Sequence, residues 1–141
     1  MRLVIQRATS ASVDVDGVRV AQFEGPGLVI LVGVTHDDTT ATASALARKV
    51  AGLRIMRAEL SVLEVSAPVL VVSQFTLYAD TRKGRRPSWG GAAPGPIAEP
   101  LVAAFVQALT DLGVAVQTGV FGADMALALV NDGPVTLLLD A

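Results

Sequence analysis

Hydrophobic and polar positions alternate or run together in short stretches along the chain, which predicts strands in its first and last parts. The early strands are expected at Arg2–Ala8, Ala11–Val15, Val18–Phe23 and Leu28–Val34. Asp16-Gly17 separates two of them and is a strong signal for a tight hairpin turn. The stretch after Gly25-Pro26-Gly27 is almost continuously apolar, which is typical of a strand covered on both faces.

Helical spacing of apolar residues predicts two helices. The first should run from about Thr39 to Leu53, with Asp37 or Asp38 as its cap. The second should begin near Pro96 and stop at Gly113. Its apolar stripe is expected to consist of Ile97, Leu101, Val102, Phe105, Ala108, Leu109 and Leu112.

The other predicted strands lie between and after these helices. They are Val69–Ser73, Val114–Thr118, Met125–Asn131 and Val135–Asp140. Ala79–Gly95 lacks periodicity and is rich in Gly, Pro and Arg, so we expect one long ordered loop there. The whole pattern predicts an α+β domain in which two main helices cover a mostly antiparallel sheet.

Length and composition limit this picture further. A chain of 141 residues, 52% of them hydrophobic, is expected to form a single domain, residues 1–141, with one substantial core. Its apolar runs are shorter than the roughly 18 to 20 residues needed to cross a bilayer, and polar residues interrupt the start before a signal-peptide core forms. The absence of cysteine favours a cytoplasmic protein without thiolate chemistry.

Charge and metal ligands exclude other classes. The single histidine, His36, stands beside two carboxylates without recognisable metal-ligand spacing, so we expect an exposed residue near a helix start, no metal and no cofactor. A net charge of −2 argues against indiscriminate coating of nucleic acid. Any contact with RNA must therefore be local.

No familiar catalytic motif is present, whether a GxSxG elbow, a P-loop or HExxH. The candidate segments are Ser73-Gln74-Phe75-Thr76, Arg82-Lys83-Gly84-Arg85-Arg86-Pro87, Phe121-Gly122-Ala123-Asp124-Met125 and Asn131-Asp132-Gly133-Pro134-Val135-Thr136. Each also has a purely structural interpretation: strand-end hydroxyls bonded to the backbone, a solvated basic loop, core residues, and an ordinary turn. Spacing alone does not decide between these interpretations.

Taken together, these segments resemble the D-aminoacyl-tRNA deacylase family over nearly the whole chain, from Met1 to Asp140. Gly25-Pro26-Gly27-Leu28, the stretch Val71–Asp80 and Lys83–Ser88 carry the resemblance as well. There are two departures. The chain is a few residues short between Arg57 and Val62, and Trp89 replaces the family's usual Phe. We expect neither departure to touch the site.

The resemblance implies a barrel-like sheet core and hydrolysis of the ester that joins a D-amino acid, or glycine, to tRNA, including glycine mischarged on tRNA(Ala). It places Ser73, Gln74, Phe75 and Thr76 around the ester as the catalytic segment. Backbone amides near Thr76 would act on the carbonyl oxygen, and Phe75 would lie near the terminal adenine. A hydroxyl without a neighbouring base is weakly activated, so Thr76 is expected to position substrate rather than attack it.

The resemblance also implies that Gly133-Pro134 is a cis dipeptide that enters the partner subunit's active site in a homodimer. Its backbone would face the substrate's α-ammonium and leave no room for an L-side chain. Phe121 and Met125 would line the substrate and adenosine pocket, and Arg7 would hold the dipeptide. The proposed phosphate contacts of the acceptor end are Arg82, Lys83, Arg85 and Arg86.

The sequence leaves two alternatives open. One is a related hydrolase whose main task is another residue, such as glycine on alanine tRNA. The other is a dimeric RNA-binding module without catalysis. The intact Ser73–Thr76 and Gly133-Pro134 segments favour the enzyme.

Overall fold

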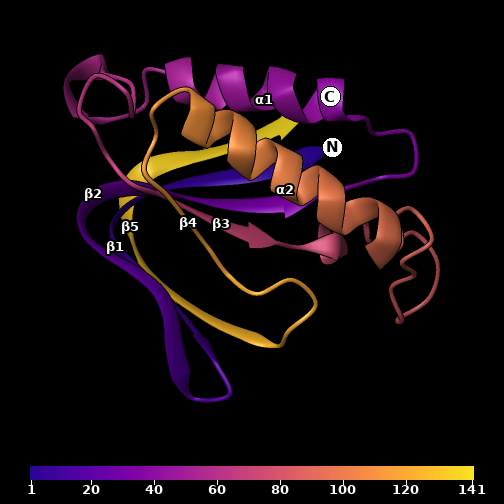
Figure 1. Ribbon diagram of the computed structural model, residues 1–141. Coiled ribbons are helices and arrows are strands. Elements are labelled where there is room, and N and C mark those ends of the chain that lie inside the picture. Colours follow the sequence, from indigo (N-terminus) through magenta and orange to yellow (C-terminus); the bar gives the residue numbers. More distant parts are fainter.

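Five strands form one mixed sheet in the computed structural model, which describes residues 1–141. They are β1 (Arg2–Val15), β2 (Val18–Gly33), β3 (Val69–Ser73), β4 (Val116–Thr118) and β5 (Met125–Asp140). Their order is β4-β3-β2-β1-β5, so that β4 and β5 are the edges (Figure 1). The three long strands pair antiparallel, whereas β2, β3 and β4 pair in parallel.

Two helices make the parallel pairings possible. The helix α1 (Thr40–Gly52) connects β2 to β3, and α2 (Gly95–Asp111) connects β3 to β4. Such crossovers are how parallel neighbours are joined. Both helices lie on the same side of the sheet, while the β1–β2 hairpin extends away from them (Figure 1). No helix has the length and hydrophobicity of a membrane-spanning segment.

Two hydrophobic clusters lie on opposite faces of the sheet. The larger, beneath the helices, includes Leu3, Ile5 and Phe105, and the smaller includes Ala11 and Val13. The strand β1 therefore changes its buried face along its length. The irregular pairing between Ala8 and Ser10 explains the change, because one extra residue in a strand reverses which side chains point inward.

The predicted α+β fold is confirmed, with several differences in detail. The sheet contains both parallel and antiparallel pairs, and its two edge strands, β4 and β5, each pair with one neighbour only. The early strands join into two long ones, and Met125–Asn131 and Val135–Asp140 are parts of one strand, β5. The turn at Asp16-Gly17 is confirmed, with φ of 49° and 77° as a primed hairpin turn requires.

Two details of the predicted helices are wrong. Thr39 caps α1, because its hydroxyl accepts from the Thr42 N–H at 3.2 Å, while the Asp38 carboxylate accepts from the Thr35 N–H at 2.7 Å instead. On α2, Ile97 and Leu112 are exposed rather than part of the apolar stripe. The buried face of that helix consists of Ala98, Leu101, Phe105 and Leu109.

Candidate active site

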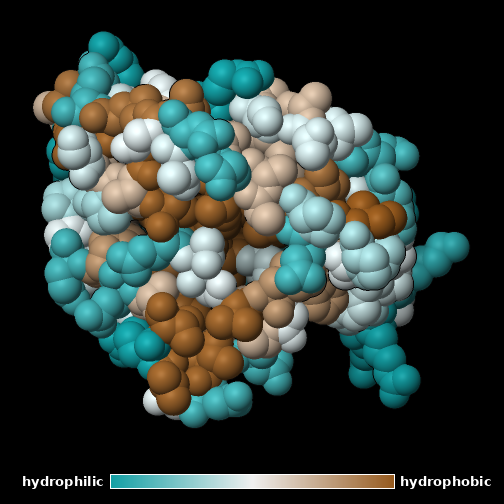
Figure 2. Space-filling model, in the orientation of Figure 1, coloured by the Kyte–Doolittle hydropathy of each residue, from teal (hydrophilic) through white to brown (hydrophobic).

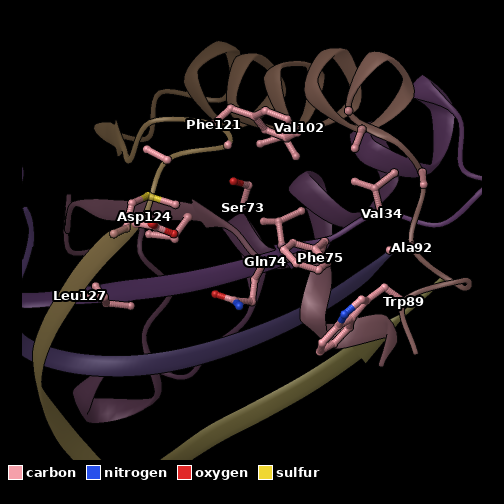
Figure 3. A pocket seen from close by; sticks show the side chains of 18 residues that line it. Val34, Ser73, Gln74, Phe75, Trp89, Ala92, Val102, Phe121, Asp124 and Leu127 are labelled. Carbon is pink, nitrogen blue, oxygen red and sulfur yellow. The ribbon is translucent and has the colours of Figure 1, made fainter. Parts of the chain in front are cut away.

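A pocket of about 580 Å³ lies between α2, the end of β3 and the residues that lead into β5 (Figure 3). Of its 18 lining residues, 13 are hydrophobic, which is typical of a site that excludes water around a ligand. The face drawn in Figure 2 is hollowed near its centre, with hydrophobic side chains around the hollow. The pocket brings together five of the predicted site residues: Ser73, Gln74, Phe75, Phe121 and Met125.

The polar segment enters the pocket because β3 ends there. The Ser73 side chain is at the last residue of β3 and points into the cavity, toward the side on which Phe121 and Val102 lie (Figure 3). A short 3-10 helix, η2 (Phe75–Tyr78), follows directly. Thr76 lies on η2 outside the pocket lining, and its hydroxyl accepts a hydrogen bond from the Gln74 side-chain amide.

The start of η2 presents free backbone donors. The Gln74 N–H donates to Val32 at 2.7 Å, whereas the N–H groups of Phe75 and Thr76 make no hydrogen bond within the chain. The first N–H groups of a helix have no partner inside it, so they are available to a ligand. These two amides are suited to stabilise negative charge on a carbonyl oxygen.

Gly33 allows η2 to lie this close to the sheet. A β-carbon on Gly33 would be 3.0 Å from the Leu77 β-carbon and 3.2 Å from the Gln74 carbonyl oxygen. Both distances are shorter than ordinary van der Waals contacts. Sequence reasoning missed this glycine, because a glycine at a strand end carries no signal of what approaches it.

Gly133 and Pro134 form an exposed bulge on β5, and the peptide bond between them is cis. In the pairing with β1, Gln6 faces Thr136 and Ala8 faces Asn131, so Arg7 alone lies opposite residues 132–135. The buried Arg7 guanidinium donates to the carbonyl oxygens of Asp132 (3.2 Å), Gly133 (3.4 Å) and Ile55 (2.8 Å). The bulge is therefore fixed to the body of the domain.

This bulge lies far from the pocket of its own chain. Ser73 is level with Val32 of β2, which pairs with Leu3 of β1, whereas Gly133 lies opposite Arg7. Ser73 and Gly133 are therefore separated by about 13 Å along the strands and about 14 Å across them. Neither Gly133 nor Pro134 lines the pocket.

The basic loop also lies outside the pocket, and its cations differ from one another. Arg82 makes a bidentate ion pair with Asp80, at 2.9 and 2.7 Å. The hydrogen bonds from Arg82 lower the pKa of Asp80 well below its usual range. Lys83, Arg85 and Arg86 are exposed and make no ion pair.

The sequence profile of D-Tyr-tRNA(Tyr) deacylases matches residues 4–140. The chain belongs to this family. It is 64% identical to a D-aminoacyl-tRNA deacylase of Cutibacterium acnes over 99% of this chain and 97% of that protein. It is 62% identical to one of Kineococcus radiotolerans over the full length of both. The predicted resemblance and its class, an ester hydrolase of the deacylase type, are therefore confirmed for the family.

Two solved structures are similar to this member of the deacylase family. One is described as a c-Myc DNA unwinding element binding protein, with a TM-score of 0.91, 34% identity and coverage of 100% of this chain and 99% of the other. The other is described as a probable eukaryotic D-amino acid tRNA deacylase, with a TM-score of 0.85, 17% identity and coverage of 99% and 98%. The second similarity concerns the fold alone.

The first departure from the deacylase pattern, the short stretch from Arg57 to Val62, contacts a site segment after all. Arg57 forms an ion pair with the Asp132 carboxylate, which also pairs with Arg7 at 2.9 Å. The hydrogen bonds and the charge of Arg57, followed by the charge of Arg7, lower the pKa of Asp132. The expectation that this stretch does not touch the site motifs is wrong, because the 3-10 turn η1 (Arg57–Glu59) directs Arg57 toward β5.

The second departure, Trp89, also lies at the site rather than apart from it. Trp89 lines the pocket and stands edge-on to Phe75, with ring centroids 5.3 Å apart (Figure 3). The expectation that this departure does not touch the site is therefore wrong. The fold of the long loop places Trp89 there. The next residue of the loop, Gly90, is held from outside the loop, because its carbonyl oxygen is 3.0 Å from the His36 imidazole. His36 itself is exposed, as predicted.

Proposed function

We propose that this chain hydrolyses the ester of D-aminoacyl-tRNA, and of glycyl-tRNA mischarged on tRNA(Ala), and spares L-aminoacyl-tRNA. The observation that carries the proposal is the apolar pocket in which Ser73 and two unpaired backbone amides meet at the start of η2. An aminoacyl ester is already activated, so orientation and donors to its carbonyl oxygen supply much of what hydrolysis requires. Water then adds to the carbonyl carbon, and the bond between that carbon and the ribose oxygen breaks. A proton from the water passes to the ribose oxygen, so that the products are the free amino acid and a ribose hydroxyl.

Two segments that line the pocket receive different proposed roles. Ser73, Gln74, Phe75 and Thr76 act as the catalytic segment around the ester, with Thr76 as a positioning residue. Phe121 and Met125 form part of the wall against substrate and adenosine. No cofactor enters this proposal.

Chiral selection is proposed to come from a second copy of the chain. Gly133-Pro134 is too far from its own pocket to contact a substrate there, yet it is exposed and fixed by Arg7. Backbone carbonyls that face the substrate's α-ammonium would reject an L-side chain by steric exclusion and admit glycine or a D-side chain. Arg7 supports this filter through its hydrogen bonds.

The edge of the sheet supports a homodimer with the active site at the subunit interface. The strand β5 is a long free edge, and the apolar side chains of Val130 and Leu138 are 58% and 69% exposed on it. Long hydrophobic edges of this kind are templates for pairing with another chain. A second copy that covers β5 would bring its own Gly133-Pro134 bulge into the interface.

The deciding assay offers the purified protein D-tyrosyl-, L-tyrosyl- and glycyl-tRNA under identical conditions. We expect release of amino acid from the D-ester and the glycyl ester, with the L-ester slower by about 100-fold or more. Equal rates on the D- and L-esters, or no hydrolysis of either, would contradict the proposal. The D-ester separates this enzyme from one devoted to glycine, since such an enzyme would hydrolyse the glycyl ester and spare the D-ester.

Thr76→Ala is expected to retain deacylation within about tenfold of wild type, because the mutation removes one neutral hydrogen bond, that from Gln74. No carboxylate or imidazole contacts the Thr76 hydroxyl, so nothing in the chain activates it as a nucleophile. Single-turnover rates on D-tyrosyl-tRNA measure the change. A loss of more than a thousandfold in a folded variant would assign covalent catalysis to Thr76 instead.

A further inference from the structure

Two exposed aromatic rings stand at the mouth of the pocket. The side chains of Phe75 and Trp89 are 55% and 42% exposed, in a chain with only 4% aromatic residues. Their planes are inclined at 77°, an edge-to-face arrangement. Large exposed rings that rim an apolar pocket indicate a surface that a ligand covers.

The Trp89 backbone is held on both sides. Ser88 and Asp80 exchange two backbone hydrogen bonds of 2.9 and 3.0 Å just before it. Just after it, the His36 imidazole contacts the Gly90 carbonyl oxygen at 3.0 Å. A ring carried by a backbone fixed in this way is ready to bind a flat partner without ordering a loop first.

The charges near Trp89 indicate what that partner is. The loop that carries it also carries Lys83, Arg85 and Arg86, which are exposed and free of ion pairs, whereas Arg82 is neutralised by Asp80. Aromatic rings beside unpaired cations are the combination that binds single-stranded nucleic acid, with bases on the rings and phosphates at the cations. A hydrophobic protein partner would not require these cations.

We propose that Trp89 is a stacking surface for an unpaired nucleobase next to the terminal one in the acceptor end of the substrate RNA. The proposal rests on the proposed function, in which Phe75 lies near the terminal base. Rings inclined at 77° cannot both stack on one flat base, so each of the two rings contacts a different nucleotide. Trp89 thus defines a subsite one nucleotide inward from the ester, toward the cations of the loop.

Trp89 is the only tryptophan of the chain, so intrinsic fluorescence reports on this subsite alone. The probe is a deacylated RNA minihelix with a single-stranded 3′ ACCA overhang, compared with the same stem made blunt. We expect saturable quenching of Trp89 by the overhang RNA and little change with the blunt stem. Equal quenching by both RNAs, or none by either, would overturn the proposal.

Variants measure the strength of the contact. Affinity is read from the fluorescence anisotropy of dye-labelled overhang RNA, which needs no tryptophan. Trp89→Ala is expected to raise Kd by about 5- to 100-fold, and Trp89→Phe to remain within about threefold, since any aromatic face stacks on a base. Val18→Ala, which removes an exposed apolar side chain at the distant β1–β2 hairpin, is the matched control and should leave Kd unchanged.

Two further outcomes would contradict the stacking proposal without affecting the deacylase proposal. If Trp89→Ala binds the overhang RNA normally, the ring is not a base-stacking surface, whatever the deacylation rate. If Trp89→Ala instead shifts the dimer dissociation constant in analytical ultracentrifugation without changing RNA affinity, a second copy covers the ring. Because the probe carries no amino acid, binding is measured separately from hydrolysis. Failure of the deacylase proposal appears only in the D- and L-ester assay.

Discussion

Gly133→Ala is expected to lower kcat/KM on D-tyrosyl-tRNA by about 100-fold or more, with no loss of fold. In its own chain the added β-carbon would meet only the Asn131 side-chain nitrogen, at an ordinary 3.6 Å, and Gly133 does not have a positive φ. If the bulge enters the partner's pocket, however, the methyl group stands between the bulge backbone and the substrate's α-ammonium. Deacylation of D-tyrosyl- and glycyl-tRNA, measured beside the free energy of unfolding in urea, tests both halves of the expectation.

The control for this variant is Gly52→Ala in the last turn of α1, where an added β-carbon meets nothing within 4 Å. Both variants should have unfolding free energies within about 1 kcal/mol of wild type. Only Gly133→Ala should lose activity. A Gly133→Ala protein that hydrolyses both esters at the wild-type rate would show that the bulge does not approach the substrate.

Much of the fold could be predicted from local signals. Asp16-Gly17 marked the hairpin, and the apolar run from Leu28 gave a central strand because side chains on both faces are buried. The parallel part of the sheet was missed, although the order strand, helix, strand, helix, strand between β2 and β4 is typical of crossovers. The long antiparallel strands outweighed this order in the prediction.

The site was predicted only in part, for a physical reason. Ser73, Phe75 and Phe121 belong to segments whose polarity or turn residues interrupt the apolar pattern, so the segments attract attention. Gly33 and Trp89 matter because the folded chain brings the catalytic segment against them. Spacing along the sequence does not reveal such contacts. Arg57 could be found only once the turn η1 was seen to direct its side chain toward Asp132.

Gly33→Val is expected to lower kcat/KM by about 100-fold by displacing the catalytic segment. The β-carbon alone would be 3.0 Å from the Leu77 β-carbon and 3.2 Å from the Gln74 carbonyl oxygen, and valine adds two methyl groups. Such overpacking costs about 1 to 3 kcal/mol of stability and pushes η2 away from the sheet. The unpaired N–H groups of Phe75 and Thr76 move with it. Single-turnover kinetics and urea unfolding measure the two effects.

Val50→Ala separates displacement of η2 from general destabilisation. Val50 is fully buried in α1, away from the pocket, so its truncation should destabilise the fold by a similar amount and leave kcat/KM near wild type well below the unfolding temperature. If Val50→Ala loses as much activity as Gly33→Val, the close approach of η2 has no special role.

Combining the two impaired variants in one dimer then tests whether the filter and the pocket come from different chains. A heterodimer of Gly133→Ala and Gly33→Val combines an intact pocket in the first chain with an intact bulge in the second, so one of its two sites regains both parts. Co-expressed with different affinity tags and purified by both, this heterodimer should recover about half the wild-type activity if the bulge acts on the partner's pocket. If the bulge served the pocket of its own chain, each site would lack one part and the heterodimer would stay inactive.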